Sequence, residues 1–153
     1  MQLNLDKIKA TLERAPKEFE GLVAQIGLPS GINYEDGISV AQVAAWNEFG
    51  TSKTPARPFI MPTVAEKKDE WTKIIAHSIP RVVRGEVSAF DVLDITGRAA
   101  SADIQTTISK VDSPKLAEST IRAKGSSKPL VDTGLMLASV QSAVNKEGAE
   151  FKA

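Results

Sequence analysis

Apolar residues recur every three or four positions in three long stretches of the chain, which is the spacing of amphipathic helices. The clearest stretch covers residues 87–111, where two apolar lines run along one segment, so we expect a helix buried on more than one side. Its small residues, Gly97 among them, would allow close contact with another helix. Similar stripes predict a helix over residues 3–15 and a longer one over residues 63–84.

Two other stretches have the composition or the alternation of β-strands. Residues 19–28 are rich in apolar and β-branched side chains and are followed by turn residues, and residues 138–144 alternate as a half-exposed strand does. A further helix is expected from Pro114 to Gly125. The predicted architecture is α+β: a small antiparallel sheet from the N- and C-terminal strands packs against two long central helices, in a single domain of residues 1–153.

A shorter helix is predicted over residues 39–49. Its start is indicated by Ser39 and Gln42, which have the spacing of a capping box. Its end is indicated by Gly50, which stands where a helix needs a left-handed residue after its last turn.

The segment from Thr51 to Ile60 is predicted to be a stiff, extended connector. Pro55, Pro58 and Pro62 fall within eight residues, and each proline fixes its own φ and restricts the residue before it. Pro62 suits the first position of the next helix.

Arg57 lies between two of these prolines and Phe59 follows it. The connector is either a rigid polar loop or a device that places Arg57 and Phe59 at fixed positions, as a structural lock or a docking edge. We hypothesise that Glu48, just before the connector, pairs with Arg57, either within one chain or across subunits.

Charge and composition exclude several classes of function. The 153 residues include 19 Lys+Arg and 19 Asp+Glu, and this zero net charge argues against strong binding to nucleic acid or to a membrane surface. With no cysteine, disulfides, thiolate metal sites and cysteine nucleophiles are excluded. His77 is the only histidine, so we interpret it as structural and expect no metal or cofactor. No apolar run resembles a signal peptide or a membrane span, so we expect a soluble protein made in a cytoplasm.

Asp132-Thr133-Gly134 has the triplet of aspartic proteases, in which two carboxylates share one proton. The triplet follows a Gly/Ser loop in a helix-rich chain, whereas a protease would place it after a hydrophobic strand. The structural alternative is that Asp132 caps a turn or helix beginning at Thr133. Residues 122–128 hold three cations and form either a solvated loop or a contact with a phosphate or an acidic partner.

Two blocks of sequence, residues 43–62 and 119–140, together resemble the neck or head–tail joining family of long-tailed bacteriophages. The family pattern is E-x-G-T followed by P-A-R-P-F, and then K-P-L-x-D-T-G before a C-terminal strand. The residues that match the first part are Glu48, Gly50, Thr51, Pro55, Ala56, Arg57, Pro58 and Phe59; those that match the second are Lys128, Pro129, Leu130, Asp132, Thr133 and Gly134. The chain departs from the pattern near Met136, where family members often have a basic residue.

The resemblance implies a structural protein of the virion neck rather than an enzyme. Such a protein would form a ring-shaped homo-oligomer, a hexamer or dodecamer, between the head-closure or connector protein and the tail terminator or tail tube protein. DNA would pass through the ring only as transiting cargo, and no membrane or cofactor would be involved. We also expect the loop of residues 125–134 to be mobile in the free subunit and to become ordered against a neighbouring ring. The alternatives are a tail terminator in the same machine, a hydrolase built on Asp132, and a stand-alone DNA-binding module.

Overall fold

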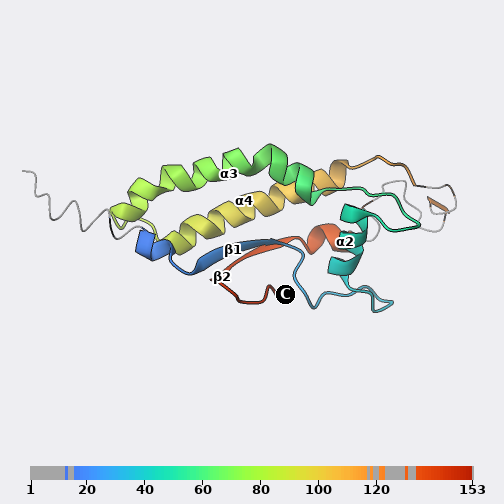
Figure 1. Ribbon diagram of the computed structural model, residues 1–153, viewed down its shortest axis with the longest axis horizontal. Helices are drawn as coiled ribbons and strands as arrows, with labels where there is room; N and C mark the ends of the chain where they lie inside the picture. The colour runs from blue at the N-terminus through green and yellow to red at the C-terminus, as the bar shows by residue number, and fades with distance from the viewer. Residues whose placement is uncertain are drawn as a thin grey trace, which may run out of the picture.

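The computed structural model describes residues 13, 16–116, 118, 121–122, 130 and 134–152. Along this part of the chain the elements are β1 (Leu22–Gly27), α2 (Val40–Phe49), α3 (Ile60–Val83), α4 (Ala89–Lys110), α6 (Leu135–Ala138) and β2 (Gln141–Lys146) (Figure 1). Among these residues, no helix is long and apolar enough to cross a membrane.

The two strands form one antiparallel sheet, in which Leu22 lies opposite Lys146 and Gly27 opposite Gln141. Helix α4 packs on this sheet and α3 packs on α4, so the sheet, α4 and α3 form successive layers (Figure 1). The α+β fold predicted from the sequence, with a small sheet of early and late strands covered by two long helices, is confirmed.

Helix α4 begins at a capping box that the sequence analysis did not identify. The Ser88 hydroxyl accepts the Asp91 N–H, and the Asp91 carboxylate accepts the Ser88 N–H. The pKa of the Asp91 carboxyl group is lowered by the hydrogen bond that it accepts from the Ser88 hydroxyl and, after that, by the one from the Ser88 N–H. The small residue Gly97 lies where α4 crosses the sheet: a Cβ atom at Gly97 would lie 2.9 Å from the Cβ of Ser142 in β2. The close contact expected with another helix is therefore made with a strand.

Helix α3 is the outer layer, and only Thr63 and Val82 of its residues are buried. Polar groups join it to α4, because the hydroxyls of Thr63 and Thr107 are 2.6 Å apart and Trp71 Nε1 donates to the Asp103 carboxylate at 2.8 Å. His77 is exposed on α3, with Nδ1 2.8 Å from the carbonyl oxygen of Lys73.

The hydrophobic core lies where α2, the connector and α4 meet. Its buried members are Val40, Ala44, Phe59, Ile104, Ile108, Leu130, Met136 and Val140. Phe59 is fully buried, so the connector contributes the largest side chain of this core.

Both strands are shorter than predicted. Residues 16–19 are helical and Gly21 has a φ of 69°, so β1 begins only at Leu22. Residues 135–138 form helix α6, so β2 begins at Gln141.

The helix predicted from Ser39 starts as expected, with Ser39 at its N-cap, but without the predicted cap, and the start of another predicted helix is wrong. The capping box at Ser39 does not form: Ser39 pairs with Asn33 in a β-bridge, and the Val40 N–H donates to the Ile32 carbonyl instead. The helix expected from Pro114 does not begin there, because residues 111–116 are not helical. The helix predicted over residues 3–15 lies, apart from Glu13, outside the described residues.

Candidate functional site: the connector between α2 and α3

Glu48, in the last turn of α2, caps the N-terminus of α3 with its buried carboxylate. Oε2 accepts the backbone N–H groups of Phe59 and Ile60 at 2.8 and 2.9 Å, and Oε1 accepts that of Met61 at 2.8 Å. The first N–H groups of a helix have no partner within the helix and attract negative charge. One side chain therefore satisfies three of them.

Pro62 completes this arrangement because it has no N–H group to satisfy. It occupies the third position of α3 rather than the first position predicted, since the helix begins at Ile60. The turn that Glu48 caps therefore retains no free backbone donor between Phe59 and Pro62.

The start of the connector is a tight loop rather than an extended segment. The Thr51 hydroxyl accepts the N–H groups of Lys53 and Thr54, and the Thr51 N–H donates to the Thr54 carbonyl at 2.9 Å. Gly50 has φ 75° and ψ 176°, a conformation open essentially to glycine alone and different from the left-handed one predicted. A Cβ at Gly50 would lie 2.9 Å from the backbone nitrogen of Ala56, so the loop folds directly over this glycine.

The second half of the connector alternates between solvent and core. Pro55, Ala56 and Pro58 are exposed, whereas Arg57 and Phe59 are buried. The backbone N–H of Arg57 donates to the Asn47 carbonyl, which holds this half against α2.

The Arg57 guanidinium binds the loop that follows α4. Nε donates to the carbonyl of Pro114 at 2.8 Å and Nη2 to that of Lys115 at 3.3 Å. The hypothesis that Glu48 and Arg57 pair within the chain is therefore wrong, since the carboxylate of Glu48 binds backbone N–H groups and Arg57 binds backbone carbonyls. The two charges instead tie α2, α3 and the 112–116 loop together. We call Glu48, Gly50, Thr51, Arg57 and Phe59 the connector lock.

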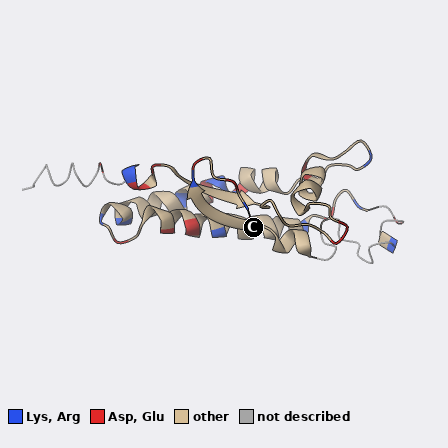
Figure 2. Ribbon diagram, turned by 90° about the horizontal axis from the view of Figure 1, so that it is seen from below, with Lys and Arg blue, Asp and Glu red and all other residues tan. Residues whose placement is uncertain are grey.

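The charges outside the connector lock show no dominant sign in the described part of the chain. Positively and negatively charged residues are interspersed along the long helices (Figure 2). Neighbours form exposed ion pairs, such as Lys67 with Glu70 and Arg98 with Asp94, which contribute little to stability. Among the described residues, no group of three His, Cys, Asp or Glu side chains is placed to hold a metal ion.

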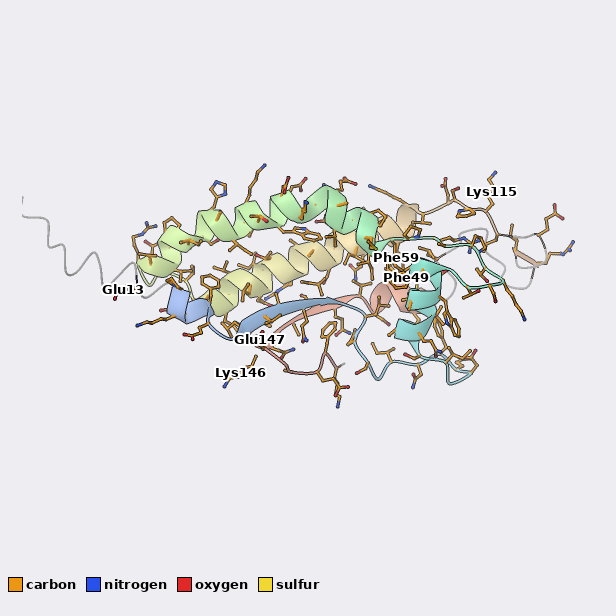
Figure 3. All side chains as sticks on the ribbon, in the orientation of Figure 1. Glu13, Phe49, Phe59, Lys115, Lys146 and Glu147 are labelled. Carbon is orange, nitrogen blue, oxygen red and sulfur yellow. The ribbon has the colours of Figure 1, made fainter. Side chains whose placement is uncertain are left out.

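Two large apolar side chains are exposed directly beside the lock. Phe49, next to Glu48, is 74% exposed, and Met61, the third residue capped by Glu48, is 65% exposed. Figure 3 shows Phe49 and Phe59 at the same end of the sheet, with Lys115 beyond them. Consecutive helical residues point about 100° apart, so the inward position of Glu48 turns Phe49 toward solvent.

Phe49 and Met61 border an apolar groove of about 290 Å³. Ile26 and Leu28 at the end of β1, Ala45 of α2, and Phe151 also line it. Glu48 is the one charged residue in its lining, and its carboxylate faces backbone N–H groups. We call this cavity the connector groove.

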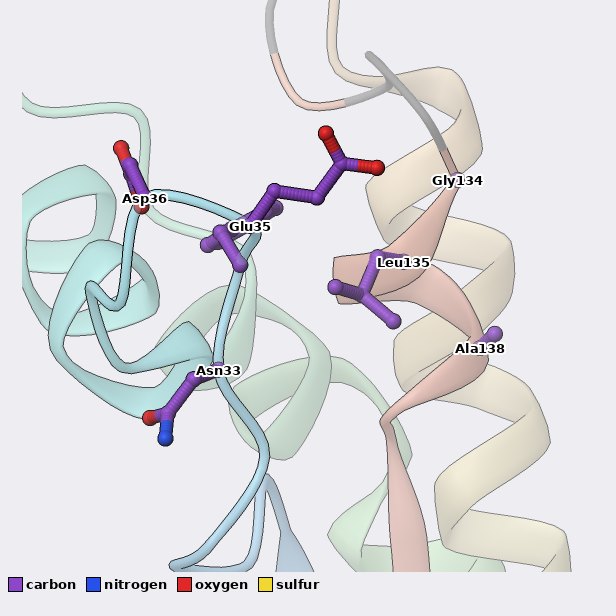
Figure 4. Close-up of a pocket in the computed structure, with 7 residues that line it drawn as sticks. Asn33, Glu35, Asp36, Gly134, Leu135 and Ala138 are labelled. Carbon is purple, nitrogen blue, oxygen red and sulfur yellow. The ribbon is translucent and has the colours of Figure 1, made fainter.

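A second cavity, of about 690 Å³, lies beside the second block of sequence (Figure 4). Glu35 and Asp36 project from the loop after β1, and Leu135 and Ala138 of α6 lie across from them. Gly134, at φ 79° and ψ −4°, precedes α6, so this helix begins two residues later than the predicted start at Thr133. Lys128, Pro129, Asp132 and Thr133 lie outside the described residues, as does most of the predicted 125–134 loop.

The sequence singled out the residues of the connector lock but not the exposed apolar residues beside it. Phe49 and Met61 were given no role, although adjacent helical residues such as Glu48 and Phe49 lie on different sides of α2. Ile26, Leu28 and Phe151 carry no local signal, because only the fold brings the end of β1 and the C-terminal segment to the connector.

Comparison with protein-family models, with curated protein sequences and with solved structures found no match.

Proposed function

We propose that this protein is a structural component of a tailed-phage virion, forming a ring in the neck that joins the head-closure or connector complex to the tail around the DNA channel. One observation carries the proposal. Five of the residues through which the first block resembles the neck family form the connector lock, in which Glu48, Arg57 and Phe59 are buried, and two apolar side chains beside it are exposed to solvent.

The lock has the properties of a structural device rather than a reactive one. Its carboxylate and its guanidinium both bind backbone groups, so neither is free to act on a substrate. Beside the lock the apolar side chains of Phe49 and Met61 are exposed, and exposed apolar surface is typical of contacts between proteins. A subunit that works by fitting its neighbours needs this combination of rigid backbone and apolar surface.

The charge distribution supports the same role. The chain has no net charge, and residues of both charges are interspersed in its described part. Proteins that grip DNA neutralise phosphates with clustered Lys and Arg side chains, and their affinity falls steeply with salt. A ring through which DNA slides would hold the DNA less tightly without such a cluster.

Electron microscopy of the purified protein and of particles tests the proposal. We expect rings from the purified chain, and we expect the chain to be found by mass spectrometry in complete particles of the phage or prophage that encodes it. Deletion of the gene should leave filled heads and tails of normal length that do not join. A chain absent from finished particles would refute the proposal.

The same deletion separates the alternatives. Overlong tails would indicate a tail terminator instead of a neck protein. Normal assembly with loss of infectivity in Asp132→Asn, together with a pepstatin-sensitive activity, would indicate a hydrolase.

A further inference from the structure

The connector groove lies at one end of β1, and the described chain starts at the other. Ile26 and Leu28 line the groove at the C-terminal end of β1. Glu13 lies beyond the opposite end of the strand, and Phe49 lies at the groove (Figure 3). The six residues of β1 alone separate these ends by about 20 Å.

The chain before Glu13 contains an apolar stripe that needs a partner. Leu5, Ile8 and Leu12 are spaced by three and four residues, which places them on one face of a helix. An amphipathic segment of this length is marginal alone and gains its stability by burying the apolar face.

A helix over this stripe is too short to reach the connector groove of its own chain. Leu12 is bonded to Glu13, which lies at the far end of the molecule. Leu5 is eight residues from Glu13, so a helix would carry it only about 12 Å, less than the length of β1. A second copy placed head to tail has no such limit.

We infer that residues 3–12 of one copy form a helix, and that the apolar face of this helix fills the connector groove of the next copy. That face consists of Leu5, Ile8 and Leu12. The groove is lined by apolar side chains, its single carboxylate faces inward, and Phe49 and Met61 stand at its border to cover the helix. Because the arm and the groove lie at opposite ends, the contact is heterologous, and heterologous contacts close into rings when the rotation allows. The inference rests on the proposed ring and names the contact that builds it.

Disulfide cross-linking tests this contact cleanly, because the chain has no cysteine of its own. We expect the double variant Ile8→Cys, Met61→Cys to give, on mild oxidation, a ladder of covalently linked chains up to the size of the ring. Ala10→Cys with Met61→Cys is the matched control, since Ala10 lies on the opposite face of the predicted helix and should cross-link at least tenfold more slowly. A single band of cross-linked monomer would overturn the inference, because it would place the arm in the groove of its own chain.

A second variant tests the groove without a cysteine. Phe49→Ser should weaken association between full-length chains by about tenfold or more, since burial of a Phe side chain contributes at least the ~1.4 kcal/mol of a tenfold change. Ile95→Ser removes another exposed apolar side chain, on α4 and outside the groove, and should leave association unchanged. Equal effects of the two substitutions would refute the role of the groove.

These outcomes separate the contact from the ring itself. Rings that form without the Ile8–Met61 ladder overturn the arm-and-groove contact and leave the proposed function standing. A chain that stays single at every concentration, with no ladder, overturns both.

Discussion

Replacing Glu48 by alanine should destabilise the protein far more than a surface substitution would. The change removes three hydrogen bonds from a carboxylate, and each hydrogen bond to a charged group contributes about 1.5–3 kcal/mol. The three share one side chain, and in the variant water can reach the partly buried amides of Ile60 and Met61. We therefore expect a loss of about 3–5 kcal/mol, the cost typical of breaking a buried charged pair.

Such a loss is a large part of the ~5–15 kcal/mol that stabilises a domain of this kind. It corresponds to a fall in Tm of roughly 6–20 °C, measurable by calorimetry or by circular dichroism during heating. Glu48→Gln keeps one acceptor oxygen but points an NH₂ group at a backbone N–H, so we expect it to lower the unfolding free energy by about half as much as Glu48→Ala. Fraying of the first turn should appear as faster amide exchange at Phe59, Ile60 and Met61.

The control is Glu66→Gln, which changes a glutamate in α3 whose side chain is 76% exposed. We expect a change in unfolding free energy of no more than about 0.5 kcal/mol. Equal Tm values for Glu48→Gln and Glu66→Gln would show that the carboxylate of Glu48 does not hold the two helices together.

Four further substitutions test other contacts. Gly50→Ala should lower the unfolding free energy by about 1–3 kcal/mol because of the backbone conformation of Gly50, and further because the added Cβ clashes with the 54–56 backbone. This loss should exceed that of Gly148→Ala, whose added Cβ meets no atom within 4 Å, and chemical denaturation compares the two variants. Arg57→Ala should lower the unfolding free energy by about 2–4 kcal/mol, because it leaves the carbonyls of Pro114 and Lys115 without the donor that they have in the lock. Under the proposed function it should also impair virion assembly. A variant with unchanged stability and assembly would refute the role of Arg57 in the lock. Gly97→Ala should cost about 1–3 kcal/mol by pushing α4 off β2, visible as a lower denaturation midpoint. Because the folded-state pKa of Asp91 is lowered, the contribution of its carboxylate to stability is complete above the usual carboxyl pKa of about 3.9 and is lost as pH falls through the folded-state pKa. Asp91→Asn should therefore flatten the acidic part of a curve of unfolding free energy against pH. An unchanged curve would contradict the capping role of Asp91.

The long elements of the fold could be predicted because their signals are local. The stripe over residues 87–111 gave α4 within a residue or two at each end, since a helix buried along one side must repeat its apolar residues with the helical period. The residues at which the strands begin were harder to predict. Phe19 and Ala138 were placed at the starts of the predicted strands, yet both are helical, because short apolar runs do not distinguish the two states.

The lock shows what local reasoning misses. The sequence indicated that Glu48, Gly50 and Arg57 matter, and opposite charges nine residues apart made an ion pair the natural hypothesis. A helix N-terminus is an equally good partner for a carboxylate, and carbonyl oxygens are equally good partners for a guanidinium. Only the three-dimensional path of the connector, which turns back over Gly50, decides between them.

Glu48 and Phe49 are adjacent but have different structural roles, and this difference has a consequence for substitution at the two positions. Position 48 requires two acceptor oxygens on a two-carbon arm: aspartate would fall short, and glutamine would replace an acceptor by a donor. Position 49 makes no comparable demand, since its side chain stands in solvent. Substitution at position 49 can therefore change the surface that the protein exposes while the residue one place earlier keeps the scaffold rigid.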